Sequence, residues 1–502
     1  MINRFLIRIL TAFFLITTTA FSQEEWGKEK EVMSEFITET IKLDVATIDS
    51  LLEQSLNLND CVAIALRNNI QLQIDRMEYN RVYQSKQGTR QSFFPDLSLN
   101  IEREQTTQFD TLDVMSDKTT NEKIDISLTE KVPLGGSLVF TRQLTRTTNQ
   151  TDRLEDNPTN LWTITFTQPI LKGFGFNIGY SDVKLADLDV KIEQYRLHDA
   201  ILGTIFQVKE ALFEVLRQKK LLVATEAAIE RSLKLKDVSL AKVDAKIATR
   251  RDVLSAEIIL QQDYGEKINA QREFDNALDV LKNVMGVDIQ RDISLAIDTL
   301  SFIPVELKEE EWISIAMNNN TTIKLQEMIL EKGKFQTKLA RNNTLPDLSL
   351  EGVISRRSDD DIFRETRQND IVGRIKLSYP LPNFSNRAEH QRAKLAERQS
   401  ERSLEDTRRN ILLSVRASTR NLRNGEERLK ILQQNISAAR EKITFATTMF
   451  NLGRASNLDI TDAQKDLLEA EVDYAQELSD YYVVQALLES LLGGHPIIHQ
   501  NN

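Results

Sequence analysis

Apolar positions along the chain switch from a helical spacing to a strand spacing at a proline. Over 58–94 the apolar side chains recur mostly every three or four positions, the spacing of one helix face. After Pro95 they alternate with polar residues, as at Leu97, Leu99 and Ile101, which is the period of a strand with one apolar face. Proline disfavours helix in the residue before it. The pattern therefore predicts a helix over 58–94 and then a strand.

The same passage occurs a second time. The run PDLSL at 95–99 reappears at 346–350, an offset of 251 residues (346 minus 95), and Asn69 and Asn320 keep this offset. A two-fold internal repeat of this size predicts two similar halves, each one structural unit. The second copy predicts a helix over 307–345 and then another strand.

Alternating segments predict the number of strands in each half. The first half contains four such segments and the second contains two. Pro169 and Pro380, at the ends of the strand regions, differ by 211 positions, so the first half is 40 residues longer there (251 minus 211). That length suits one extra hairpin. Short turns at one end and long polar loops at the other are typical of outer-membrane β-barrels, and a soluble antiparallel sheet with one wet face is the alternative.

Long helical stretches follow the strands in both halves. Two proline-free stretches of about 66 residues would each extend about 100 Å as a helix. Each leads into a shorter helix, and two short helices stacked end to end would match one long helix. Antiparallel coiled coils of uniform length are expected. The predicted ranges are 181–246 then 249–286, and 385–450 then 457–492.

The N-terminus has the features of a secretory signal. Arg4 and Arg8 precede an apolar run over 9–16, and small residues stand at Ala20 and Ser22 before Gln23. Downstream, no run of 18 or more apolar residues could form a membrane helix. We therefore expect an exported protein without a transmembrane helix.

Composition and charge exclude several function classes. A formal net charge of −11 argues against nucleic-acid binding. The single cysteine, Cys61, is expected to be a small apolar helix residue. No nucleophile motif, phosphate loop or metal-ligand spacing occurs, so we expect no enzyme activity, cofactor or metal. The four histidines are isolated on helices or on the tail: His198, His390, His495 and His499.

The chain resembles the TolC family of outer-membrane efflux and secretion channels. The doubled NN…PDLSL passages, the strand end at 168–170 and the run LGRASNLDITDA at 452–463 carry the resemblance. It implies a mainly α fold whose long antiparallel helices form a periplasmic tunnel, while strands from three chains close one β-barrel in the outer membrane. The implied partners are a periplasmic adaptor protein, an inner-membrane pump and outer-membrane lipid.

The resemblance also implies a site at the periplasmic mouth of the tunnel. Family members carry an aspartate ring there, and the matching residues are Asp459 and Asp462, which share a helix face. Rings of carboxylates favour cations. In the first half Asp252 matches the first acid, but Ser255 replaces the second. A solvated helix face is the alternative reading of these acids.

Two departures from the family pattern leave questions open. Some relatives close the mouth with a tyrosine and an arginine, where this sequence has Phe450 and Ala455. Nearby arginines are candidates for that role, and the turns are expected to contact the adaptor through Gly453, Arg454, Ala455, Arg250 and Arg251. Six strands per chain also exceed the usual four, so either the trimer barrel has 18 strands or the extra hairpin lies outside it.

The expected organisation divides the chain into segments and implies a function for the whole. The function is a duct for small-molecule efflux or for type I protein secretion, and a structural periplasmic coiled-coil spacer is the alternative. The helix–strand transitions are expected at Pro95, Pro169, Pro346 and Pro380. The segments are a signal peptide (1–22), an acidic arm (23–55), helix (56–95), strands (96–172) and tunnel helices (173–290) of the first half, a link (291–306), helix (307–346), strands (347–382) and tunnel helices (383–493) of the second half, and a tail (494–502).

Overall fold

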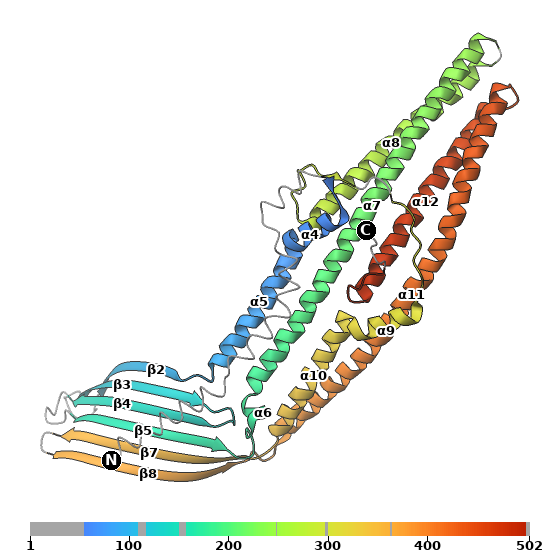
Figure 1. The fold of residues 1–502 in the computed structure, drawn as a ribbon. Coiled ribbons are helices and arrows are strands. Elements are labelled where there is room, and N and C mark those ends of the chain that lie inside the picture. The colour runs from blue at the N-terminus through green and yellow to red at the C-terminus, as the bar shows by residue number, and fades with distance from the viewer. Residues whose placement is uncertain are drawn as a thin grey trace. The chain divides into compact units, whose positions relative to one another are not determined.

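The computed structural model describes most of the chain (Figure 1). The predicted signal peptide, all but the last residue of the predicted acidic arm, and the end of the tail lie outside the described residues. No helix within the described part has both the length and the apolar character needed to cross a membrane. The described ranges are 55–108, 117–149, 157–246, 248–296, 300–361 and 364–497.

The chain divides into two compact units. Unit 1 draws on Met1–Ile74, Ala200–Trp312 and Ser414–Asn502, and unit 2 on Asp75–Asp199 and Ile313–Leu413. Unit 2 holds a six-stranded sheet, and unit 1 holds the turns between the long helices and their shorter successors.

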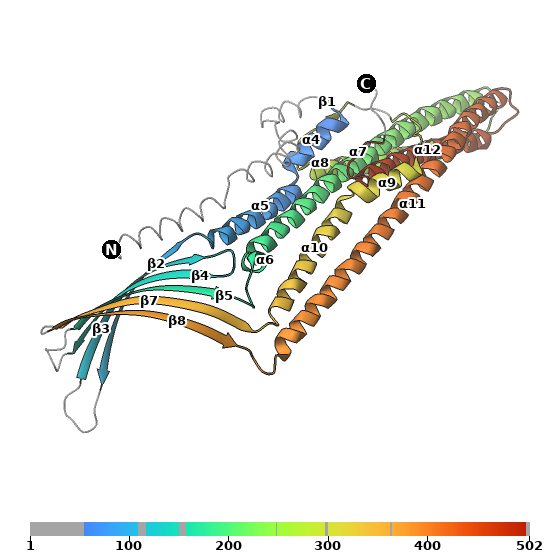
Figure 2. The same ribbon diagram turned by 60° about the horizontal axis from the view of Figure 1, so that its bottom comes forward.

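All strands of the sheet are antiparallel to their neighbours, and they curve along their length (Figure 2). Their order in the sheet is β2-β3-β4-β5-β7-β8. Four strands come from the first half and two from the second. They are β2 (Asp96–Gln108), β3 (Asp117–Lys131), β4 (Ser137–Asn149), β5 (Asn157–Pro169), β7 (Asp347–Asp361) and β8 (Arg364–Ser378).

The two faces of this sheet differ sharply in polarity. Successive side chains of a strand point to opposite faces, so each row of paired residues belongs to one face. One row across all six strands is entirely apolar, and the next row is entirely polar. The apolar row is Leu97, Leu128, Phe140, Ile164, Ile354 and Ile371, and the polar row is Ser98, Ser127, Thr141, Thr163, Ser355 and Asp370.

The long helices lie close to their predicted ranges. They are α7 (Ser181–Asp244) and α11 (Phe384–Asn451), and the shorter helices after them are α8 (Arg250–Met285) and α12 (Asn457–Leu491). A one-turn helix, α6 (Phe176–Gly179), precedes α7, and a short parallel pairing joins β1 (Ser55–Leu56) to β6 (Ser294–Leu295).

The helices predicted over 58–94 and 307–345 are each broken in two, so the single-helix prediction was wrong. The first is α4 (Leu58–Asn68) and α5 (Ile70–Gln91), and the second is α9 (Glu309–Asn319) and α10 (Thr321–Asn342). An asparagine stands at each break, Asn69 and Asn320.

Both breaks have the same physical cause. Asn69 Oδ1 accepts a hydrogen bond from the backbone N–H of Leu72 at 2.9 Å, and Asn320 Oδ1 accepts one from Ile323 at 3.1 Å. Asparagine is favoured at a helix N-cap because its side chain satisfies an otherwise unpaired N–H group. Asn69 also donates from Nδ2 to the carbonyl of Val284 at 2.8 Å, which attaches the break to the end of α8.

The core of unit 1 lies where α4, α7 and α8 meet. Its fully buried residues include Ile64, Leu212 and Leu281. Cys61 lies in this core, and burial raises the pKa of its thiol to about 12. The expectation of a small apolar residue at this position agrees with this environment.

Candidate functional site

The turn between α11 and α12 is built by a glycine. Gly453 adopts a left-handed conformation with φ +69°, which costs glycine little because it has no Cβ. Its N–H bonds to the carbonyl of Phe450, and the N–H of Arg454 bonds to that of Met449. This Schellman arrangement satisfies the last carbonyl groups of α11. The matching position in the α7–α8 turn, 207 residues earlier, is Lys246, which takes φ +60° without being glycine.

Each turn is followed by a capping box that contains a predicted mouth aspartate. Asp459 Oδ2 accepts hydrogen bonds from the N–H and Oγ of Ser456 at 2.7 and 2.8 Å. Asp252 Oδ2 accepts the same pair from Thr249, both at 2.8 Å. Because these bonds favour the ionised form, chiefly through the backbone N–H, the pKa of each carboxyl is below its ordinary value. The two acids thus hold their own helix ends in place.

Asp462 differs from the two capping acids. It is exposed, one turn beyond Asp459 on α12, and takes no part in the cap. Its carboxylate contributes to raising the pKa of Lys442 on α11, although the Asp466 carboxylate is the main cause. Asp462 is therefore the predicted mouth residue whose carboxylate is least committed to local structure.

A buried asparagine, Asn457, joins the two helical hairpins just beside these caps. Its side chain is 5% exposed, and Nδ2 donates to Ser239 Oγ at 3.1 Å and to the backbone carbonyl of Asp252 at 2.8 Å. Ser239 lies on α7 and is completely buried. One amide of α12 is thus bonded to both α7 and α8.

A lysine from α7 reaches the end of α11 in the same region. Lys242 Nζ lies 3.3 Å from the centroid of the Phe450 ring and donates a hydrogen bond to the Phe450 carbonyl. The ring face is electron-rich, so it attracts the ammonium group. Burial lowers the pKa of Lys242. We call Ser239, Lys242, Asp252, Phe450 and Asn457 the hairpin junction.

A buried apolar cluster completes the hairpin junction. Residues from all four helices form one buried cluster, and Ala455 from the turn packs against it. Arg454, Arg250 and Arg251 are instead exposed beside it. The buried members of the cluster are Leu235, Ala256, Ala446, Phe450, Ile460 and Ala463.

Sequence patterns did not reveal the junction. Asn457 and Ser239 are 218 positions apart, and neither stands in a repeat or motif that marks it as buried and paired. The sequence indicated only that Phe450 differs from the tyrosine expected from the family resemblance. The contact with Lys242 could not be read from the spacing, because a long helix offers many lysines.

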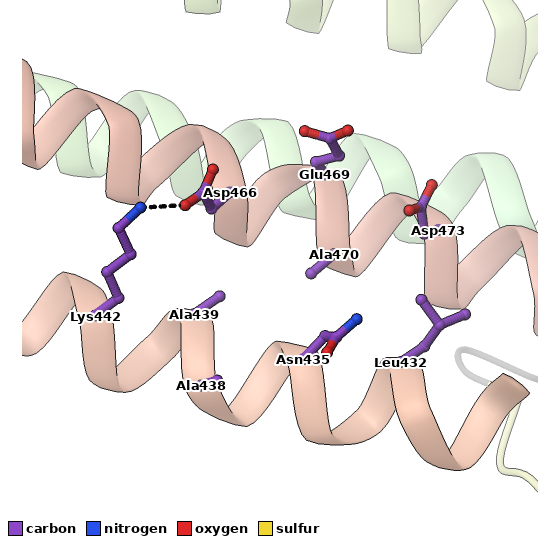
Figure 3. A pocket seen from close by; sticks show the side chains of 9 residues that line it. All are labelled: Leu432, Asn435, Ala438, Ala439, Lys442, Asp466, Glu469, Ala470 and Asp473. Carbon is purple, nitrogen blue, oxygen red and sulfur yellow. Dashed lines mark hydrogen bonds and ion pairs between the residues drawn. The ribbon is translucent and has the colours of Figure 1, made fainter.

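A groove lined by acids runs between α11 and α12, about 370 Å³ in volume (Figure 3). Lys442 of α11 pairs with Asp466 of α12 at one end, while Glu469 and Asp473 continue along the α12 side. Ala439 and Ala470 leave the space between the helices open. The groove can accommodate a cationic or small polar side chain.

The four transition prolines all lie at ends of the outer or joining strands. Pro95 and Pro346 stand one residue before β2 and β7, Pro169 is the last residue of β5, and Pro380 stands two residues beyond β8. Proline lacks the N–H that would continue a helix or a strand ladder, which suits it to these positions.

The chain is similar to outer-membrane channel and secretion proteins. Residues 312–494 match the family described as outer membrane efflux protein. Outer membrane protein TolC of Vibrio cholerae is 22% identical over 301 residues, covering 58% of this chain and 68% of that protein. Proteases secretion protein PrtF of Dickeya chrysanthemi is 24% identical over 339 residues, covering 65% and 71%. Residues 312–494 therefore belong to the outer membrane efflux protein family, and the chain as a whole resembles TolC-type channels.

The fold agrees with this similarity. The outer membrane channel CmeC of Campylobacter jejuni superposes with a TM-score of 0.67 at 14% identity, covering 87% of this chain and 85% of that one. Phe450, one of the two positions at which the sequence departs from the expected pattern, lies against the ammonium group of Lys242. The six-stranded sheet is the second departure.

Proposed function

We propose that three copies of this chain form the outer-membrane duct of a tripartite efflux or export system. In this proposal the duct receives its cargo from a periplasmic adaptor protein and an inner-membrane pump and releases it outside the cell. The helices line a periplasmic tunnel, and the strands of three copies close a barrel in the outer membrane. The match of residues 312–494 to the outer membrane efflux protein family is the observation that carries the proposal.

The polarity of the sheet supports its role as a barrel wall. Its apolar face carries rows such as Leu128, Phe140 and Ile164, and its other face carries serines, threonines and charged residues. A strand that separates lipid from a wet lumen needs this alternation. Each strand has 13 or 15 residues, and about nine to eleven residues are enough for a tilted strand to span the bilayer.

The capped turns support a cation-selective mouth. In three copies Asp459 and Asp462 would supply six carboxylates, with Asp252 close to Asn457 at the same junction. The pKa of Asp459 lies below its ordinary value because the cap bonds favour the ionised form, so the cap does not neutralise this carboxylate. A ring of fixed negative charges raises the local concentration of cations and repels anions.

Fractionation and conductance test the duct. We expect the protein in the detergent-extracted outer membrane, with the mass of three chains in mild detergent and with a conductance in planar bilayers. A periplasmic coiled-coil spacer would instead appear in the soluble fraction without detergent and would leave the bilayer sealed, and that outcome would exclude the duct.

Substitutions test the mouth. Asp462→Asn is the cleaner variant because this side chain is not part of a cap, and Asp459→Asn with Asp462→Asn should reduce the cation preference further. Asp480→Asn, an exposed acid further along α12, is the control and should leave the preference unchanged. Equal selectivity in all of these variants would refute the assignment.

Protein secretion is the second candidate cargo class. PrtF, named as a proteases secretion protein, matches a larger share of this chain than the Vibrio TolC does. Identification of the pump and adaptor that co-purify with the duct would separate the two cargo classes, because the pump selects the cargo.

A further inference from the structure

Within the described part of the chain, the two outer strands of the sheet, β2 and β8, each have no neighbouring strand on one side. Their apolar side chains are correspondingly open: Leu99 of β2 is 64% exposed and Ile375 of β8 is 76% exposed. Leu350 of β7 occupies the repeat position of Leu99 but has strands on both sides, and it is only 42% exposed. An edge of unpaired N–H and C=O groups along 13 to 15 residues requires a partner strand inside a membrane.

The chain contains its own example of how such edges join. β5, the last strand of the first half, pairs with β7, the first strand of the second half, and Pro169 faces Ser349. The offset of 211 residues makes β8 the counterpart of β5, and the offset of 251 residues makes β2 the counterpart of β7. If β8 of one copy meets β2 of the next copy in the same register, Pro380 faces Ser98.

Side chains along the two edges fit this register. In this register, four residues from the pair Pro380 and Ser98, Lys376 of β8 faces Glu102 of β2. Two residues further, Arg374 faces Glu104. Opposite charges placed directly across an antiparallel pair stabilise it, and like charges destabilise it. On the opposite face, Leu377 meets Ile101.

Each edge keeps at least one charged side chain that has no ion-pair partner among the described residues of its own chain. Among the described residues, Lys376 and Glu104 have no ion pair, Glu102 lies opposite Lys123, and Arg374 binds Glu351 at 2.8 Å. The β2 edge therefore offers carboxylates and the β8 edge offers cations on the same polar face, which makes the two edges complementary.

We infer that β8 of one copy pairs with β2 of the next in the β5–β7 register, so that all six strands of each copy line the barrel. This inference rests on the trimer of the proposed function, and it gives a barrel of 18 strands. The alternative, an extra hairpin outside the wall, conflicts with the continuous pairing of β2 through β8, because the hairpin of β3 and β4 lies in the interior of the sheet.

The strand number sets the width of the duct. With strands about 4.8 Å apart and tilted about 40°, 18 strands give a backbone radius of about 18 Å, and 12 strands give about 12 Å. The extra hairpin thus widens the barrel by about half, which suits a bulkier cargo.

Disulfide cross-linking in the full-length protein tests the register. Glu102→Cys with Lys376→Cys should convert most of the protein, after mild oxidation in membranes, into two- and three-copy species that a reductant reverses. Glu102→Cys with Val372→Cys is the matched control for the within-half register of β7 and β8, where Asp347 faces Ser378. A four-residue slip separates the Cα atoms by about 13 Å, whereas a disulfide needs less than about 7 Å.

Two further pairs make the result interpretable. Thr165→Cys with Val353→Cys occupies the equivalent position inside the chain, so it should oxidise without any multi-copy species. Arg103→Cys with Ile375→Cys lies in the same predicted register and replaces the first pair if that variant does not accumulate. Cys61 is buried with a raised pKa and should not react.

The outcomes separate this inference from the proposed function. Three-copy species from the 102/376 pair, with the 102/372 pair at background, support the register and the 18 strands. A trimer that cross-links only through 102/372, or through neither register, overturns the inference and leaves the duct intact. A species limited to two copies overturns the 18 strands, and a protein with the mass of one chain in mild detergent overturns the trimeric duct itself.

Discussion

Replacing Asn457 with alanine should loosen both helical hairpins at once. The side chain joins α12 to the Ser239 hydroxyl of α7 and to the Asp252 carbonyl of α8. An alanine cannot replace either bond, and the buried site offers little access to water. We therefore expect the α7–α8 turn to respond to a substitution made in α12.

The change in the free energy of local opening follows from the hydrogen bonds that are lost and those that remain. Ser239 Oγ keeps its hydrogen bond to the Leu235 carbonyl at 2.8 Å, so the hydroxyl still has a partner in the variant. Two net hydrogen bonds are lost, and each contributes about 0.5–1.5 kcal/mol, so local opening should become easier by about 1–3 kcal/mol. Since 1.4 kcal/mol is a factor of ten, amide exchange should accelerate by about 5- to 150-fold.

Hydrogen exchange measured by mass spectrometry reports such local opening. Peptides covering 236–246 and 452–462 should both exchange faster in Asn457→Ala. Ser437→Ala is the control, because that exposed hydroxyl bonds only to the Gln433 carbonyl of its own helix. Exchange within two-fold of the wild type, or faster exchange in α12 alone, would refute the role of Asn457 as a link between hairpins.

Three further substitutions or conditions test other features. Lys246→Gly should stabilise the protein by about 1 kcal/mol, because φ +60° is strained for a residue with a Cβ. The same change at Lys234, inside α7, should destabilise it by about 1 kcal/mol, and thermal denaturation that gives both the same sign would contradict the argument. The caps of Asp252 and Asp459 have lowered pKa values, so their stabilisation is present above the ordinary value of 3.8 and is lost as the pH falls through the folded-state pKa. The melting temperature of the variant Asp252→Asn with Asp459→Asn should therefore depend less on pH below 4 than that of the wild type, and an unchanged pH dependence would count against the caps. Cys61, with its pKa raised to about 12, should resist maleimide at pH 8 until the protein is unfolded, and rapid labelling of the native protein would contradict its burial.

Period and repeat predicted most of the elements because they are local properties. Alternation over a few residues places side chains on two faces wherever the strand lies, so segments such as 162–167 could be identified without knowledge of their partners. The long helices were predicted in the same way, because their stretches contain no proline to interrupt a helix.

The broken helices show the limit of periodicity. Apolar spacing continues through Asn69 and Asn320, so a single helix was predicted in each half. The break depends on the competition of one side chain for a backbone N–H, and at Asn69 also on the carbonyl of Val284, which is 215 positions away. The repeat of the asparagines was visible in the sequence, but its meaning required these contacts.

The sequence alone determined the kind of elements, their order and the family resemblance, since these depend on local spacing and on residues that lie near one another in the chain. Only the tertiary structure decided which strands are neighbours and which side chains are buried. The β5–β7 pairing and the position of the extra hairpin inside the sheet depend on register between distant segments. Asn457 and Lys242 obtained their roles in the same way, because burial and pairing come from neighbours about 200 residues away in the chain.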